Sequence, residues 1–300
     1  MKIPQLYAND GPLPPDQIGL LVPTDPFTTD FGVVRQRLAD DGYVLLKGLL
    51  PREDVLRVRE KYFGHLSAAS FLKPGTAAVD GIFNSDRDIS DFPSMGATVV
   101  PPGGADQFMK LATELIDYVS KLNNWGSNTR SIARTVIRNA TPGNKGIGVH
   151  YDYIFLRYGE DTVLTGWVPM GDIKIEGGGL IYLEKGHELG MQFEKEFTEK
   201  AIASGFSEEE AKSAYNTNMM QDGILADGAR EYGLQQKRRW LASAYEAGDV
   251  VLHSSYSIHS STINHDKEGI IRLGTDLRFV DTSRPWDERW DNVFHPDDGL

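Results

Sequence analysis

His150 and Asp152 lie two residues apart in the stretch 148–152. Side chains on a β-strand alternate with period two, so we expect this imidazole and this carboxylate to point to the same side. A second imidazole from a distant strand would complete a set of two histidines and one carboxylate, and His259 in the stretch 256–261 supplies one. Such a set on one face of a metal ion suits non-haem Fe(II) and leaves positions open for other ligands.

Arg272 follows in an apolar, strand-like stretch, 270–274. A buried guanidinium is costly unless an anion pairs with it, and its planar fork suits a carboxylate. Ser261 lies two residues after His259, so it shares the face of that ligand and can donate its hydroxyl to the same carboxylate. A keto acid that chelates the metal at one end and pairs with Arg272 at the other would satisfy both groups.

The composition limits which chemistry is available. The chain has 300 residues, of which 40% are hydrophobic and 10% aromatic, enough for the core of one large domain. A formal charge of −12 argues against nucleic-acid or anionic-membrane partners, which require basic surface. Because there is no cysteine, thiolate nucleophiles and Cys-type metal sites are excluded, and metal ligands must be His, Asp or Glu.

The first residues, 1–17, are polar and proline-rich and do not resemble a signal peptide. No apolar run reaches the roughly 18 residues that a membrane-spanning helix needs. We therefore expect a cytoplasmic protein that acts on a small molecule, without a nucleic-acid or membrane partner. The sequence leaves a homodimer open.

The elements that must position these residues fall into two groups. In the first half, prolines predict an extended arm over 1–26 with little regular structure, and a loop is expected over 67–105. Apolar periodicity predicts helices over 30–41, capped by Thr29 or Asp30, over 52–66 and over 105–122, with a buried strand at 43–46.

From residue 130 onward the pattern changes to short strands separated by turns. Strands are expected at 131–139, 148–152, 162–170, 180–183, 250–253, 258–261 and 270–280, and a turn at 186–190. Residues 191–238 are charged and helical in pattern and predict an insertion, or lid, that covers the mouth of the site. We expect one domain over 1–300, mainly β with flanking helices, as an antiparallel barrel or a jelly roll.

Further motifs follow one another in a specific order and spacing. They are His150 and Asp152, then Trp167, the stretches 177–187 and 248–253, His259 with Ser260, Ser261 and Asn264, and Arg272. This set resembles the phytanoyl-CoA dioxygenase family of Fe(II)/2-oxoglutarate-dependent oxygenases. The resemblance is specific over 148–280. It is less specific over the helical N-terminal region, including 42–46.

The resemblance implies a double-stranded β-helix of the cupin-like, jelly-roll type. It implies that His150, Asp152 and His259 hold Fe(II), and that 2-oxoglutarate and O2 are cosubstrates. It also implies contacts to 2-oxoglutarate from Arg272, Ser261 and Trp167. Two alternatives stay open. The span from His259 to Arg272 is slightly longer than in the family's founding member, so Arg278 competes with Arg272 as the anchor, and His253, at the end of an apolar strand, competes with His259 as the third ligand.

The function expected is oxidation of a small molecule by hydroxylation, desaturation or oxidative cyclisation. A natural-product intermediate, either amino-acid-derived or terpenoid, is preferred over an acyl-CoA, because the chain is acidic and has few basic clusters. The alternatives are a metal-dependent isomerase or hydrolase on a cupin-like barrel, and a non-catalytic metal-binding homologue.

Overall fold

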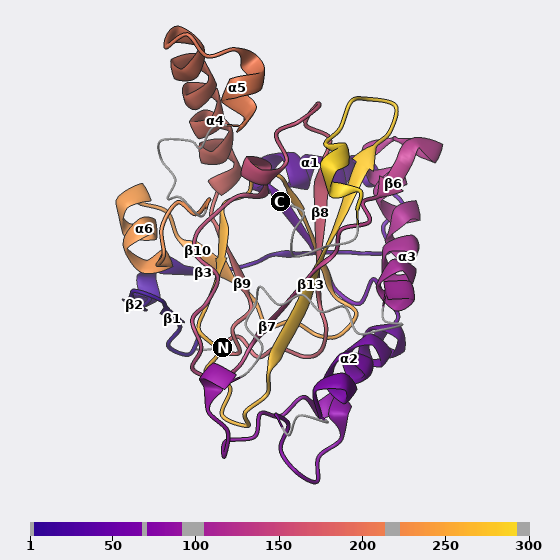
Figure 1. The fold of residues 1–300 in the computed structure, drawn as a ribbon, viewed down its shortest axis with the longest axis vertical. Helices are drawn as coiled ribbons and strands as arrows, with labels where there is room; N and C mark the ends of the chain where they lie inside the picture. The colour runs from indigo at the N-terminus through magenta and orange to yellow at the C-terminus, as the bar shows by residue number, and fades with distance from the viewer. Residues whose placement is uncertain (1–2, 68–70, 92–104, 214–222, 293–300) are drawn as a thin grey trace.

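Two facing β-sheets form the body of the molecule, which the computed structural model describes at residues 3–67, 71–91, 105–213 and 223–292 (Figure 1). The larger sheet has the order β4-β5-β11-β8-β13-β6, with β7 also paired to β13, and the smaller has the order β12-β9-β10-β3. A hairpin, β1-β2, stands apart from both. The expected jelly roll with flanking helices is confirmed, and the sheets do not close into a continuous barrel within the described residues.

The strands and short 3-10 helices have the following bounds. The strands are β1 Tyr7–Ala8, β2 Gly11–Pro12, β3 Ile18–Leu20, β4 Pro23–Thr24, β5 Tyr43–Leu46, β6 Thr129–Ser131, β7 Val136–Ala140, β8 Leu164–Pro169, β9 Leu180–Leu183, β10 Trp240–Ala242, β11 Val250–Ser254, β12 His259–Ser261 and β13 Arg272–Asp281. The 3-10 helices are η1 Pro15–Gln17, η2 Ala78–Asp80, η3 Ile89–Asp91, η4 Gly126–Asn128, η5 Asp152–Phe155 and η6 Glu288–Trp290.

Side chains of the larger sheet alternate between a helix-covered face and a face that meets the smaller sheet. In β8, Leu164 and Val168 pack in the cluster beneath the helices, whereas Trp167 packs between the sheets with Val251 and Tyr182. The alternation follows from the period of two in a strand. Both faces are buried, and the polar groups of the candidate site project from the inner one.

Three helices cover the outer face of the larger sheet: α1 Phe31–Asp41, α2 Arg52–Ser67 and α3 Ala105–Asn123. The predicted cap of the first is confirmed, since the Asp30 carboxylate accepts hydrogen bonds from the amides of Gly32 and Val33. On the side of the smaller sheet lie α4 Gly186–Ala203, α5 Glu208–Ser213 and α6 Ala229–Gln236. No described helix has the length and apolar character needed to cross a bilayer.

Three expectations about elements outside the candidate site were wrong. The arm over 3–26 is not free of regular structure, because β3 pairs parallel with β10 and β4 pairs parallel with β5. The strand expected over 131–139 is divided into β6 and β7. The turn expected at 186–190 is the first part of α4, which begins after Lys185 in a left-handed conformation. Strands of two or three residues are too short to show periodicity, which explains the first two errors.

Two predicted segments lie partly outside the described residues. The loop over 67–105 is described at 71–91, where Leu72 bridges Phe83, and the helical insertion over 191–238 is described except for 214–222.

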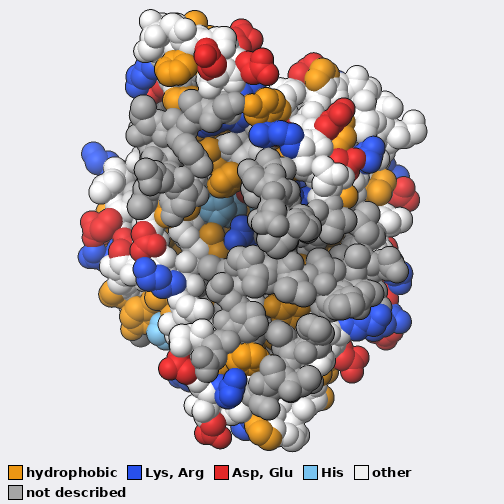
Figure 2. All heavy atoms as spheres, viewed as in Figure 1, with side chains coloured by type: hydrophobic (Ala, Val, Ile, Leu, Met, Phe, Trp, Pro, Cys, Tyr) orange, Lys and Arg blue, Asp and Glu red, His pale blue; other side chains and the backbone are white. Residues whose placement is uncertain are grey.

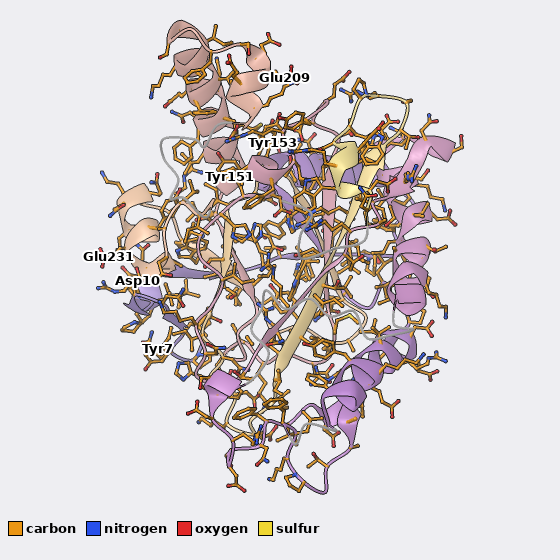
Figure 3. All side chains as sticks on the ribbon, in the orientation of Figure 1. Tyr7, Asp10, Tyr151, Tyr153, Glu209 and Glu231 are labelled. Carbon is orange, nitrogen blue, oxygen red and sulfur yellow. The ribbon has the colours of Figure 1, made fainter. Side chains whose placement is uncertain are left out.

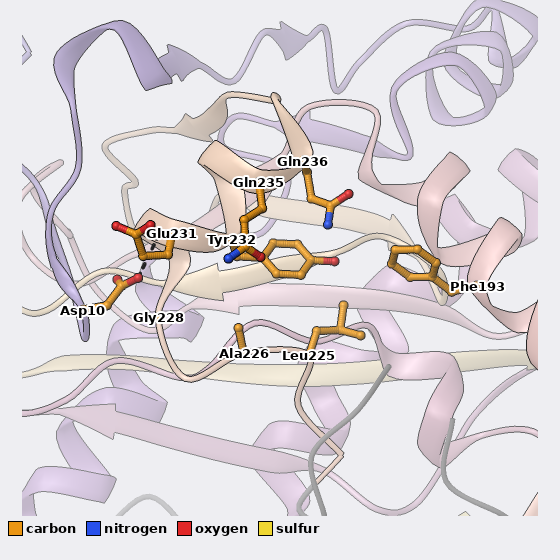
Figure 4. A pocket seen from close by; sticks show the side chains of 9 residues that line it. All are labelled: Asp10, Phe193, Leu225, Ala226, Gly228, Glu231, Tyr232, Gln235 and Gln236. Carbon is orange, nitrogen blue, oxygen red and sulfur yellow. Dashed lines mark hydrogen bonds between the residues drawn. The ribbon is translucent and has the colours of Figure 1, made fainter. Parts of the chain in front are cut away.

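Asp10, at the tip of the β1-β2 hairpin, caps α6 from a remote part of the chain (Figure 4). Its Oδ1 accepts from the Arg230 amide at 3.0 Å and its Oδ2 from the Glu231 amide at 2.8 Å. Gly228 allows this approach, because a Cβ there would lie 2.0 Å from the Asp10 carboxyl carbon. The hairpin is thereby tied to the helix that flanks the smaller sheet.

We expect Asp10→Ala to lower the free energy of unfolding by about 1 kcal/mol, the usual effect of losing an N-cap side chain. Chemical denaturation measures this change. Asp16→Ala removes an exposed carboxylate from the same arm and serves as the control. Equal stability of the two variants would contradict the capping role.

Candidate active site

His150, Asp152 and His259 come together in the interior. One ligand atom from each of the three lies within 4.8 Å of the others, and all three side chains are buried. Backbone pairing brings the histidines together, since the His150 amide donates to the His259 carbonyl at 3.0 Å and the reverse bond is 2.8 Å. Three donors of this type, grouped on one side, fit a divalent iron ion.

Asp152 does not continue a strand, contrary to expectation. It is the first residue of η5, Asp152–Phe155, so the chain turns directly after the extended Tyr151. The expectation that the His150 and Asp152 side chains lie close together is nevertheless confirmed. The turn thus points the carboxylate toward the histidines without a regular strand.

Both histidines are oriented by a carbonyl two residues earlier in the chain. His150 Nδ1 lies 2.8 Å from the Gly148 carbonyl oxygen, and His259 Nδ1 lies 2.9 Å from the Ser257 carbonyl oxygen. A carbonyl only accepts, so each Nδ1 carries the proton and each Nε2 presents its lone pair. Fixing the tautomer in this way is the usual support for a metal-binding imidazole.

Electrostatics favour the metal-binding forms of the ligands. Burial lowers the pKa of His150, and burial together with the nearby His150 and His253 lowers the pKa of His259 well below its ordinary value. Burial opposes ionisation of Asp152, but Arg278, His253 and His259 outweigh it and hold the pKa of its carboxyl well below the usual range. At neutral pH the site therefore contains two neutral imidazoles and one carboxylate.

Three side chains converge on one oxygen of Asp152. The Thr165 hydroxyl donates to Oδ2 at 2.7 Å, and His253 Nε2 and Arg278 Nη2 each lie 3.6 Å from the same oxygen. Oδ1 is then the oxygen left for a metal. Sequence reasoning missed these contacts, although the period-two spacing of Arg278 from Arg272 places both on one face of β13.

The structure separates the two histidines that competed as third ligand. His253 is fully buried, faces Asp152 with Nε2 and lies 3.1 Å from the Tyr182 hydroxyl through Nδ1. His259, not His253, belongs to the cluster of candidate ligands. His253 thus supports the carboxylate.

A cavity opens beside the two histidines. Figure 2 shows a hollow near the centre of this face, with histidine at its base and a basic side chain beside it. Gly274 makes room for the Trp167 ring, since a Cβ would lie 2.8 Å from its Nε1. Besides His150 and His259, the described residues that line the cavity are Arg138, Ile147, Trp167, Leu180, Gly274 and Asp276.

Arg272 lies on the inner face of β13, as Gly274 does, and its exposed fraction is only 1%. Its Nε donates to the Gly178 carbonyl at 2.8 Å, and its Nη2 has no hydrogen-bond partner among the described residues. Burial, aided by Arg138, lowers the pKa of Arg272 to about 10, so it is still charged at neutral pH. Ser261 accepts from the Ile147 amide at 2.7 Å, which leaves its own proton free to donate.

Tyr151, between the two ligands in sequence, connects the site to α4. Its hydroxyl donates to Glu194 Oε1 at 2.5 Å, and Arg157 holds the same carboxylate through two bonds, of 2.9 and 2.7 Å. Tyr151 and Tyr153 lie at the base of α4 (Figure 3). The start of the predicted insertion is therefore fixed to the metal-binding segment by a buried ion pair.

Comparison with known proteins agrees with this geometry. The family model for "Phytanoyl-CoA dioxygenase (PhyH)" matches residues 38–270. The chain belongs to the phytanoyl-CoA dioxygenase family. A search of curated proteins finds no match.

Several solved structures share the fold of this family member. The alpha-ketoglutarate-dependent carbocyclase SnoK from nogalamycin biosynthesis has a TM-score of 0.54 and 14% identity, covering 93% of this chain and 92% of that one. The epimerase SnoN in complex with Fe3+, alpha-ketoglutarate and nogalamycin RO has a TM-score of 0.51 and 17% identity, covering 90% and 91%. EctD from S. alaskensis with bound Fe has a TM-score of 0.51 and 15% identity, covering 89% and 82%.

Family membership and the buried His-Asp-His cluster together make this chain a 2-oxoglutarate-dependent dioxygenase that uses Fe(II), 2-oxoglutarate and O2. The donor set fits Fe(II), with His150, Asp152 and His259 as the residues that would hold it.

We expect His259→Ala to abolish Fe(II) binding measured by anaerobic calorimetry, because a ligand is lost. His253→Gln should weaken it by about 10–100-fold, the usual effect of removing a group that supports a ligand. If His253→Gln abolished Fe(II) binding and His259→Ala only weakened it, His253 would be the metal ligand and His259 the supporting residue.

Thr165→Val removes the shortest of the three contacts to Asp152 while conserving shape. We expect about 10–100-fold weaker Fe(II) binding in the same measurement. Thr141→Val is the matched control, since Thr141 is buried and its hydroxyl has no partner among the described residues. Similar losses in both variants would show a general packing effect instead.

Proposed function

We propose that this enzyme oxidises a small natural-product intermediate by hydroxylation, desaturation or oxidative cyclisation. Iron held by His150, Asp152 and His259 would, with 2-oxoglutarate and O2, supply the oxidising chemistry for removing hydrogen from an unactivated carbon, as 2-oxoglutarate is converted to succinate and CO2. The residues of the chain orient the two substrates and exclude water from the reacting atoms.

The observation that carries the assignment of the cosubstrate site is the buried, incompletely paired guanidinium of Arg272. Burying a charged nitrogen without a partner is costly, so an anionic ligand is expected there. The 2-oxoglutarate carboxylate remote from the keto group fits this position, with Ser261 as a second donor and Trp167 as an apolar wall. An isomerase or hydrolase with the same metal ligands would have no need of this anchor.

Arg278 also has buried nitrogens without a hydrogen-bond partner among the described residues, Nε and Nη1, but it is the weaker candidate for the anchor because its guanidinium lies beside Asp152. The Nη2–Oδ2 separation of 3.6 Å places it next to a metal ligand. An anchor for the far end of 2-oxoglutarate must instead lie away from the metal ligands, and the charged groups that act on Arg272 are Arg138 and Asp276, not Asp152. Arg272 is therefore assigned to 2-oxoglutarate and Arg278 to the support of Asp152.

The substrate assignment draws on two observations. SnoK and SnoN, which share the fold, are described as enzymes of nogalamycin biosynthesis, an example of natural-product chemistry on this scaffold. The net charge of −12 also disfavours an acyl-CoA, which carries several phosphates. We propose that α4, α5 and α6, which contain the described helical parts of the 191–238 insertion, cover the mouth of the site.

The cosubstrate site is tested by adding Fe(II) and 2-oxoglutarate without oxygen and recording the visible charge-transfer band of the chelate. We expect a band with the unaltered protein. Arg272→Ala should require a 2-oxoglutarate concentration about 10-fold higher or more, because a charge-assisted hydrogen bond is lost. Arg284→Ala, at an arginine whose side chain is 48% exposed, is the matched control. A missing band, or equal affinity in Arg272→Ala, would overturn the assignment.

A further inference from the structure

Asp276 is a second carboxylate in the active-site cavity, and neither the metal cluster nor the cosubstrate anchor uses it. It lies on the inner face of β13, opposite Trp167 in the register of β8. Arg138 lies opposite Gly274 in the register of β7. Both charged side chains line the cavity beside His150.

The two charges form an incomplete pair. Arg138 Nε lies 3.9 Å from Asp276 Oδ2, too far for a hydrogen bond, and this is the one ion-pair contact of Asp276 among the described residues. The Asp276 carboxylate also acts at longer range on Arg272 and His150, raising the pKa of each. Elsewhere the same chain makes complete pairs: Arg52 meets Asp172 at 2.6 and 2.7 Å, and Arg239 meets Glu184 at 3.0 and 2.6 Å.

The lack of hydrogen bonds between Arg138 and Asp276 is significant because both side chains are largely buried. The side chain of Asp276 is 13% exposed and that of Arg138 is 32% exposed. A carboxylate so little exposed normally has hydrogen bonds. Arg138 can therefore donate and Asp276 accept further hydrogen bonds, and both side chains line the cavity beside His150 and His259.

The remaining cationic groups near the cavity are given other roles, although Arg278 Nε and Nη1 have no hydrogen-bond partner among the described residues. Arg278 lies beside Asp152, and Arg272 is the proposed anchor for 2-oxoglutarate. The other described lining residues, apart from the histidines, are Ile147, Trp167, Leu180 and Gly274. A neutral terpenoid would cover Arg138 and Asp276 without hydrogen bonds, and a polyanion would meet the Asp276 carboxylate.

We propose that Arg138 and Asp276 together recognise a zwitterionic substrate, a free amino acid or a close derivative. Its ammonium group binds Asp276 and its carboxylate binds Arg138. Opposite charges a few ångströms apart on the protein match the ammonium and carboxylate of one small molecule. This inference rests on the proposed oxygenase function and specifies its substrate class.

The test compares the proteinogenic L-amino acids with their N-acetyl and carboxamide derivatives and with a neutral terpene alcohol. Two readouts are used: the rise in melting temperature, which reports binding to the native state without turnover, and succinate formation with Fe(II), 2-oxoglutarate and O2. We expect at least one free amino acid to raise both. Its two derivatives should need about 10-fold higher concentrations or more, since each lacks one charge-assisted contact.

Asp276→Asn should weaken the response to the amino acid about 10-fold or more, and Asp276→Glu should restore part of it by keeping the charge. Glu268→Gln, at a side chain that is 67% exposed, is the matched control and should respond like the unaltered protein. The proposal is overturned if no free amino acid gives a response, if the N-acetyl forms or the terpene alcohol bind equally well, or if Asp276→Asn behaves like Glu268→Gln.

Two outcomes separate this proposal from the oxygenase assignment. A charge-transfer band without selectivity for zwitterions would leave the oxygenase and overturn the recognition pair. The reverse outcome is a protein that gives no charge-transfer band but is stabilised selectively by zwitterions, with the stabilisation lost in Asp276→Asn. That result would keep the recognition pair and overturn the oxygenase assignment. If Arg138→Met instead raises the 2-oxoglutarate concentration needed for the band, Arg138 binds the cosubstrate and the zwitterion proposal is overturned.

Discussion

The register between β8 and β13 is the constraint on which the active site depends. It sets Asp276 opposite Trp167 and Arg278 opposite Thr165, and it places Arg272 on the same inner face. A shift of one residue would exchange the two faces of β13. Charged groups would then enter the apolar cluster beneath α1, α2 and α3, while Leu273 and Leu277 would face the metal site. The helix-covered core therefore enforces the arrangement of charges in the cavity.

That arrangement gives each of the three arginines near the site, Arg278 and Arg272 on β13 and Arg138 on β7, a different role. Arg278 stabilises the ionised form of Asp152, Arg272 offers an unpaired nitrogen deep in the sheet, and Arg138 stands at an incomplete distance from Asp276. In a buried site, charges at such distances interact strongly, so each arginine needs an anion of its own. The three anions are a metal ligand, the proposed cosubstrate and, by our inference, part of the substrate.

Sequence patterns predicted much of the site, because its ligands depend on residue type and short spacing. The triad, the capped helix after Asp30 and the main strands of the larger sheet were all expected, and the family resemblance supplied the fold. The turn at Asp152 was not expected, since an isolated extended stretch and a 3-10 turn look alike over a few residues. The contacts of Thr165, Arg278 and Asp276 were also missed, because they depend on register between strands far apart in sequence.

The N-terminal arm also has a consequence for how the protein is made. Its strand β3 pairs with β10, and Asp10 caps α6, so both partners lie beyond residue 228. On the ribosome, this arm must wait until residues 230–242 have been synthesised before it can dock. The edge of the smaller sheet is thus completed by a segment made well before its partner strand, and closure over that edge is a late, long-range event in folding.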